Sequence, residues 1–267
     1  MDSTRPYCFP DSASTAAATD FCYDPPAAAH GAKRILVKPN LGYPVGPPVT
    51  VSMPILQAVL QGIRRVNSQA EILIVEGVCS PVSLTEIASR NGLDAVLDEG
   101  MQLLDADTLP LCAYPNRSLQ PVRFKTMLAP ALLAEVDCCI SVAAFKRTML
   151  QGKPLISASL KNLYGLFPRA YYKARSASSR GQLHRPSVPL VLQDVYFSIG
   201  TYFQGAVVDG CHMLASPDWK PDRGRSIPLG QVTWGNSLLA VDRSACQSAG
   251  ESVPDYIEAI EALRSLA

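Results

Sequence analysis

Short apolar runs alternate with longer amphipathic stretches along the first part of the chain. Ile35 to Val37 is a run of strand type, and apolar positions then recur at helical spacing from Ile55 to Val66. Ile72 to Val75 is a second run of strand type. A strand, a crossover helix and another strand form a βαβ unit. The pattern therefore predicts an α/β protein with a mostly parallel sheet flanked by helices in Rossmann-like layers.

Turn and capping signals continue this alternation towards the C-terminus. Ser83 to Glu86 is a capping box, which predicts a short helix that stops at Asn91-Gly92. Later apolar runs predict further strands, and spaced apolar positions predict further helices. The expected strands are 136–142, 206–208 and 232–234, and the expected helices are 189–199 and the segment after Pro254.

The first 32 residues lack this periodicity. They are rich in Ala, Ser, Thr and Pro, a composition typical of an extended or poorly ordered leader. We expect the fold to begin at Lys33 and to form a single α/β domain over residues 33–267, with a subdivision near residue 135 as the alternative.

Charge is distributed unevenly along the chain. Residues 138–193 contain no Asp or Glu and carry a net charge of +9, against −4 for each flanking part. A field of one sign attracts anions, although a solvated basic face or a mobile loop would have the same composition. We expect a basic, loop-rich insertion here. Its cations are Lys146, Arg147, Lys153, Lys161, Arg169, Lys173, Arg175, Arg180 and Arg185.

The overall composition is that of an ordinary globular protein. The apolar content is 48%, the apolar runs are far shorter than a membrane span, and no signal-peptide pattern occurs near the start. We therefore expect a cytoplasmic location and no membrane partner. The eight cysteines have no CxxC spacing, and neither a GxGxxG nor a GxxxxGK[ST] motif occurs. No cofactor and no metal site are predicted.

Polar and charged residues follow several of the predicted strands. In open parallel sheets, ligands bind beyond the carboxyl ends of the strands, so we expect these residues to converge on one edge. The cations and amides would hold and orient an anion, and a carboxylate would move a proton. Each residue could instead be a surface strand end or a turn cap. The candidates are Lys38, Asn40, Glu76, Lys146, Arg147 and Asp209.

A second candidate element is the apolar stretch from Ser157 to Gly165, which carries Lys161 and Asn162 side by side. A lysine near other cations loses its proton more readily and can act as a base or a Schiff-base nucleophile, whereas a charged lysine holds an anion. The sequence leaves both roles open for Lys161. Asn162 would orient the substrate.

A third candidate is the loop over residues 169–185, whose length is typical of segments that cover ligands. Its interleaved tyrosines and arginines also suit single-stranded nucleic acid. The rest of the chain is net acidic, which argues against nucleic acid as a partner. The loop residues predicted to bind substrate are Lys173, Arg175, Arg180 and His184.

The strings at these positions occur in a definite order. They are Val37-Lys38-Pro39-Asn40-Leu41, Glu76-Gly77, Phe145-Lys146-Arg147-Thr148, Ser159 to Gly165, and Asp209-Gly210. The series resembles that of domain-of-unknown-function family 362, from about residue 33 to the end, and Leu239 to Asp242 is similar to its late A-x-D segment. The resemblance implies an α/β enzyme. Thr148 stands where relatives commonly have His, and the closely spaced cysteines of ferredoxin-type relatives are missing.

We therefore predict an enzyme that acts on a small carboxylate or phosphorylated metabolite by Lys/Glu acid–base chemistry, without a redox cofactor. The reaction type would be an isomerisation, an elimination or carbon–carbon chemistry. Two other classes stay open, namely a non-catalytic polyanion- or RNA-binding module and a metal or iron–sulfur redox protein. The expected partner is the small anionic substrate, and a homodimer is compatible with the sequence.

Overall fold

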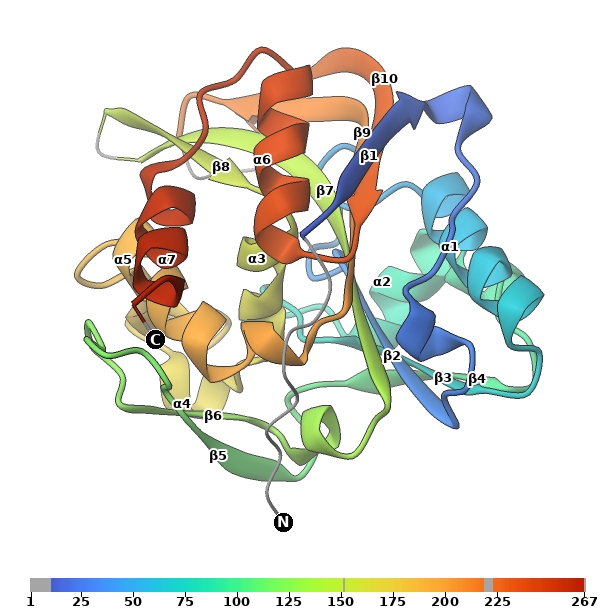
Figure 1. Cartoon of the computed structure of the whole chain (residues 1–267), viewed down its shortest axis with the longest axis horizontal. Coiled ribbons are helices and arrows are strands. Elements are labelled where there is room, and N and C mark those ends of the chain that lie inside the picture. The colour runs from blue at the N-terminus through green and yellow to red at the C-terminus, as the bar shows by residue number, and fades with distance from the viewer. Residues whose placement is uncertain (1–10, 151, 219–222, 267) are drawn as a thin grey trace.

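A mixed sheet of eight strands runs through the molecule, with helices on both faces (Figure 1). The computed structural model describes residues 11–150, 152–218 and 223–266. The main sheet has the strand order β1-β10-β9-β7-β2-β3-β4, and β8 pairs with the distal part of β7. β5 and β6 form a separate two-stranded sheet.

The strands are β1 (Ala13–Ala17), β2 (Arg34–Pro39), β3 (Glu71–Glu76), β4 (Met101–Asp105), β5 (Leu111–Pro115), β6 (Thr126–Pro130), β7 (Cys138–Leu150), β8 (Lys153–Ser157), β9 (Gly205–Ser216) and β10 (Arg225–Gly235). The α-helices are α1 (Met53–Val66), α2 (Leu84–Arg90), α3 (Ser159–Asn162), α4 (Arg169–Tyr172), α5 (Val188–Ser198), α6 (Leu238–Ser248) and α7 (Asp255–Arg264).

The centre of the sheet is parallel. β9, β7, β2, β3 and β4 pair in parallel, whereas β1, β10 and β8 pair in antiparallel fashion with their neighbours. Parallel neighbours need a crossover connection, and α1 supplies it between β2 and β3. The predicted fold class, a mostly parallel sheet flanked by helices, is confirmed.

The first βαβ unit forms where the apolar pattern places it. α1 follows Ser52 with a proline in its first turn and buries the residues that recur at helical spacing, such as Ile55 and Val59. α2 begins after Ser83, whose hydroxyl accepts the backbone N–H of Glu86 at 3.2 Å. The chain leaves this helix through Gly92, which has a φ of 79° that favours glycine.

The sheet begins earlier than residue 33. β1 pairs with β10 at the edge of the sheet, and Tyr23 and Ala29 are buried in the core. The described residues 11–32 are therefore part of the domain rather than a leader, and residues 1–10 lie outside the described residues. β1 consists of small residues that are mostly exposed, so no apolar period marks it in the sequence.

Much of the basic segment is also regular structure. β7 continues through Lys146 and Arg147 to Leu150 and turns back as β8, whereas the apolar run predicted a strand only to residue 142. Pairing with β8 and β9 supplies backbone hydrogen bonds over this polar half of the strand, so apolar side chains are not required for it to persist. β9 likewise extends to Ser216, with a register shift against β7 between Ala144 and Lys146.

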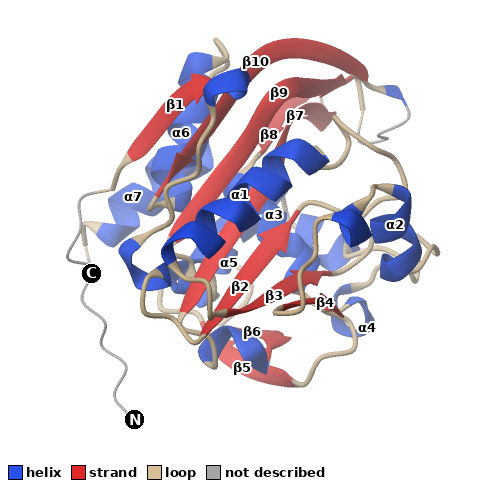
Figure 2. Ribbon diagram, turned by 90° about the vertical axis from the view of Figure 1, so that its right-hand side faces the viewer, coloured by secondary structure: helices blue, strands red, loops and turns tan. Residues whose placement is uncertain are grey.

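The two faces of the sheet carry separate cores. Along β7, Cys139 and Phe145 belong to the core shared with α3, α5, α6 and α7, whereas Ile140 and Val142 belong to the core under α1. Figure 2 shows α1 lying across its face of the sheet. No helix within the described ranges is both long and apolar enough to cross a membrane.

Candidate functional site

The carboxyl ends of β2 and β3 meet at a buried ion pair. Lys38 Nζ lies 2.7 Å from Glu76 Oε1, and both side chains are almost fully buried. Glu76 also accepts the backbone N–H groups of Leu41 at 2.7 Å and Gly77 at 2.8 Å. Burial lowers the pKa of Lys38, and the Glu76 carboxylate opposes that shift. The charge of Lys38 is therefore balanced inside the protein.

Two asparagine amides connect this pair to the next strand. Asn162 Oδ1 accepts hydrogen bonds from Lys38 Nζ and Asn40 Nδ2, both at 3.2 Å. Asn162 Nδ2 donates to the carbonyl oxygen of Lys38 at 2.8 Å and to the Ser141 hydroxyl at 3.1 Å. These contacts hold α3 against the ends of β2 and β7.

Two further lysines stand beside the asparagines. Lys146 Nζ donates to Asn40 Oδ1 at 2.8 Å, and burial together with the nearby Lys161 ammonium lowers the pKa of Lys146 to about 7. Burial also lowers the pKa of Lys161, whose Nζ lies 5.4 Å from the centre of the Tyr164 ring. Within the described part of the chain, Lys161 Nζ makes no hydrogen bond or ion pair. The cluster thus has two cations without a carboxylate partner.

Two glycines allow this close assembly. A Cβ atom at Gly165 would clash with the Glu76 carboxylate and would lie 2.8 Å from Lys38 Nζ. A Cβ atom at Gly77 would clash with the Gly165 carbonyl oxygen and with Arg180. The glycines in the E-G and S-L-K-N-L-Y-G strings are therefore needed for backbone approach, which accounts for their place in the motifs.

A carboxylate on α6 fixes the short helix that carries Lys161. Asp242 is fully buried and accepts the backbone N–H groups of Ser159 at 2.7 Å and Leu160 at 3.1 Å, and the Ser159 hydroxyl at 2.5 Å. Burial raises the pKa of Asp242 to about 6, and these hydrogen bonds oppose the shift. The sequence indicated Asp242 only through the similarity of its segment to a family string.

Cys79 also belongs to the cluster, and no sequence motif predicted it there. Its sulfur accepts a hydrogen bond from Arg180 Nη1 at 3.3 Å, and it is near enough to all three lysines to raise their pKa values. The residue is exposed, and only its position just after Glu76-Gly77-Val78 marks it in the sequence.

The loop residues divide into structural and exposed groups. Arg180 is buried, donates to the carbonyl oxygens of Val78 at 2.9 Å and Gly165 at 3.1 Å, and lies 3.4 Å from Asp107. It therefore ties the loop to the strand-end cluster. Lys173 and Arg175 are exposed.

His184 lies at the cluster, although its side chain is exposed. Its ring centre is 5.9 Å from that of Tyr164. Partial desolvation by the surrounding protein and the nearby Lys161 charge lower the pKa of His184 to about 4.

Two predicted site residues bind other parts of the fold. Arg147 points away from Lys146 and pairs with Glu251 at 3.0 Å. Asp209 accepts the backbone N–H groups of Ser52 at 2.8 Å, just before α1, and of Cys211 at 3.0 Å. The structure thus brings together Lys38, Asn40, Glu76, Lys146, Lys161 and Asn162, with Arg180 and His184 beside them.

The structure also bears on metal binding. Across residues 11–150, 152–218 and 223–266, no group of three or more His, Cys, Asp or Glu side chains is arranged to hold a metal ion. None of the seven cysteines in these ranges forms a disulfide bond.

Comparison with known proteins places the chain in a family. No curated protein matches its sequence. Among solved structures, it is similar to the lactate racemase apoprotein from Thermoanaerobacterium thermosaccharolyticum, with 16% sequence identity and a TM-score of 0.49. The match covers 82% of this chain and 49% of that protein, so the chain spans about half its length. The family model described as "Domain of unknown function (DUF362)" matches residues 35–247, and the chain therefore belongs to the DUF362 family.

Proposed function

We propose that the chain is an enzyme for a small carboxylate or phosphorylated metabolite, which binds at the cluster of Lys38, Lys146 and Lys161. The observation that carries the proposal is the charge balance of this cluster. Glu76 neutralises Lys38, whereas Lys146 and Lys161 have no carboxylate partner among the described residues. A pair of cations beside the carboxyl ends of β2 and β3 favours a small anion as ligand.

Lys146 is the proposed proton-transfer group. A group whose pKa lies near the working pH is best suited to donate and accept protons, and the pKa of Lys146 is about 7. An anion bound beside it would stabilise the ammonium form and raise this pKa, so binding and protonation are coupled. Lys161 would hold the anion, Asn40 would orient the Lys146 amine, and Glu76 would position Lys38. This chemistry suits an isomerisation or an elimination.

The internal contacts of the basic segment favour this proposal over a polyanion-binding module. Arg147 pairs with Glu251, Arg169 pairs with Asp107 at 2.6 Å, and Arg180 binds backbone carbonyl groups. A surface for nucleic acid needs a row of cations directed at solvent.

Proton exchange tests the proposal for any reaction that begins with removal of a proton from the substrate. The protein is incubated in D₂O with a panel of small 2-hydroxy, 2-keto and phosphorylated carboxylates, and NMR follows the loss of the signal from the C–H proton next to the carboxylate or keto carbonyl group. We expect exchange of at least one compound, with a rate that follows a titration near pH 7. Lys146→Met and Lys161→Met should each lower the rate at least a hundredfold.

Lys153→Met is the matched control, because it removes an exposed lysine from the neighbouring strand β8. The substrate proton should exchange as fast with this variant as with the wild type. Equal rates in all three variants would contradict the site assignment. Citrate and inorganic phosphate should raise the melting temperature of the wild type and of Lys153→Met but not of Lys161→Met, which tests anion binding separately from catalysis.

A further inference from the structure

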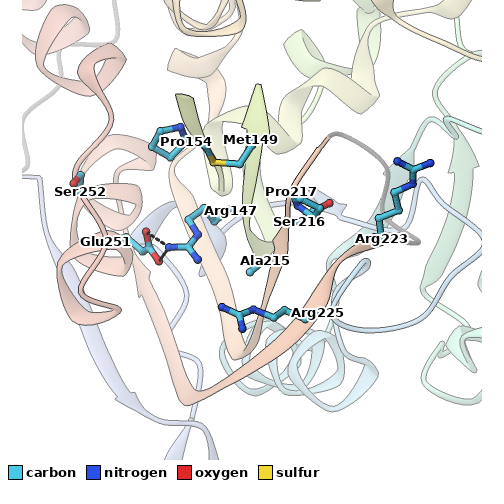
Figure 3. Close-up of a pocket in the computed structure, with 10 residues that line it drawn as sticks. All are labelled: Arg147, Met149, Pro154, Ala215, Ser216, Pro217, Arg223, Arg225, Glu251 and Ser252. Carbon is cyan, nitrogen blue, oxygen red and sulfur yellow. Dashed lines mark hydrogen bonds and ion pairs between the residues drawn. The ribbon is translucent and has the colours of Figure 1, made fainter. Parts of the chain in front are cut away.

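A groove lies on the sheet face opposite to Lys146. Adjacent residues of a strand point to opposite faces, and Arg147 accordingly faces α6 and the segment that follows it. The groove has a volume of about 590 Å³, within the range of small-molecule sites. Figure 3 shows the residues that line it, which come from β7, β8, β9, β10, the connection between β9 and β10, and the segment after α6.

Two arginines and an alanine form a row across the floor of the groove. Arg147 of β7 is in register with Ala215 of β9, and Ala215 is in register with Arg225 of β10. Residues in register on neighbouring strands point to the same face. With strands about 4.8 Å apart, the backbones of the two arginines are roughly 10 Å apart. The small Ala215 leaves the space between them open.

The charges in this row are not balanced. Arg147 is held by Glu251, and Arg223 at the rim pairs with Asp218 at 3.1 Å. Among the described residues, the Arg225 guanidinium makes no hydrogen bond or ion pair, and in Figure 3 it extends along the groove below Arg147. An unpaired guanidinium offers donors in a planar fork that suits carboxylate, sulfonate or phosphate oxygens.

The remaining walls are largely apolar. Met149, Pro154 and Pro217 present hydrocarbon and thioether surface beside the arginines. An inorganic anion would leave this surface in contact with water, and an extended polyanion would need cations spread along an open face. A ligand with one acidic group on a compact apolar body satisfies both parts of the groove.

We propose that this groove binds a small amphiphilic organic anion, with its acidic group on Arg225 and its apolar body against Met149 and Pro217. The site is separate from the lysine cluster, because none of the residues that line the groove belongs to that cluster. It does not depend on the function proposed for that cluster.

A fluorescent probe tests the proposal. Titration with 8-anilinonaphthalene-1-sulfonate, which joins a sulfonate to aromatic rings, should give saturable binding to the folded protein. Arg225→Gln should weaken this binding about tenfold, the value of one charge-assisted hydrogen bond. N-phenyl-1-naphthylamine, the same ring system without the sulfonate, should bind the wild type and Arg225→Gln equally and more weakly.

Matched variants make each outcome decisive. Arg185→Gln removes an exposed positive charge elsewhere and should leave binding unchanged, as should Lys161→Met. A second variant, Met149→Asp, places a negative charge in the groove and should weaken binding of the sulfonate probe more than binding of the neutral probe. The proposal is overturned if Arg225→Gln binds the sulfonate probe as tightly as Arg185→Gln, or if Lys161→Met abolishes that binding.

Discussion

The most specific prediction about stability concerns the buried ion pair of Lys38 and Glu76. Glu76→Gln keeps the shape of the side chain and removes its charge. Breaking a buried ion pair by neutralising one partner costs about 3–5 kcal/mol, because the other charge stays buried. The structure favours the upper half of that range. Both carboxylate oxygens of Glu76 accept backbone N–H groups, so the amide –NH₂ of glutamine must face a donor on one side.

Equilibrium urea unfolding at pH 7 measures this free energy. A loss of about 4 kcal/mol in a chain of this size corresponds to a fall in melting temperature of roughly 8–16 °C. Glu99→Gln is the control, since Glu99 is exposed and makes no hydrogen bond or ion pair with the described residues. It should change the stability by less than about 0.5 kcal/mol. A Glu76→Gln deficit below about 1 kcal/mol would refute the ion pair.

The pH dependence provides a second test of the same variant. Glu76 raises the pKa of Lys38, so the variant should have a still lower pKa at Lys38 than the wild type. A folded-state lysine pKa below the unfolded value of about 10.4 destabilises the protein while the lysine is charged, and the cost is relieved as pH rises through the folded pKa. The deficit of the variant should therefore shrink as pH rises from its own folded pKa to that of the wild type.

Two other buried carboxylates give predictions. Asp194 of α5 accepts three backbone N–H groups of the loop between β5 and β6, those of Val122 at 2.9 Å, Arg123 at 2.8 Å and Phe124 at 2.9 Å. Asp194→Ala should therefore lower the free energy of unfolding in urea by about 2–4 kcal/mol and speed proteolysis of this loop. Unchanged loop cleavage would contradict that role. Asp242 has a folded pKa of about 6, above its unfolded value, so the free energy of unfolding falls as pH rises from about 4 to about 6 and stays lower above that. The stability of the wild type relative to Asp242→Asn should thus be greater at pH 4 than at pH 7, and a constant difference would show that the pKa of Asp242 is not raised.

The sequence predicted those elements whose formation depends on local patterns. α1 and α5 have apolar positions at helical spacing, and β2 and β3 are apolar runs buried on both faces of a parallel sheet. β1, β8 and the distal half of β7 were not predicted. They are strands because neighbouring strands supply their hydrogen bonds, and a single sequence does not reveal its distant partners.

The candidate site was likewise predicted only in part from the sequence. Lys38, Asn40, Glu76 and Lys146 were expected together because parallel strands end at one edge. Asp209 was expected there on the same ground, but its carboxylate accepts the N–H groups that precede α1 and follow its own strand. A position at a strand end predicts which residues lie near one another, but it does not predict which side chains are in contact.

The amino-acid sequence by itself thus determined the α/β class, the strand-end position of Lys38 and the excess of positive charge, because these follow from periodicity and composition. Only the tertiary structure decided how that charge is distributed. It neutralises Lys38 and Arg147 with carboxylates from other elements, places the half-buried Lys146 near Lys161, and leaves Arg225 unpaired among the described residues. The effect of a charge depends on its burial and on the distance to its partners, and both are set by residues far away in the sequence.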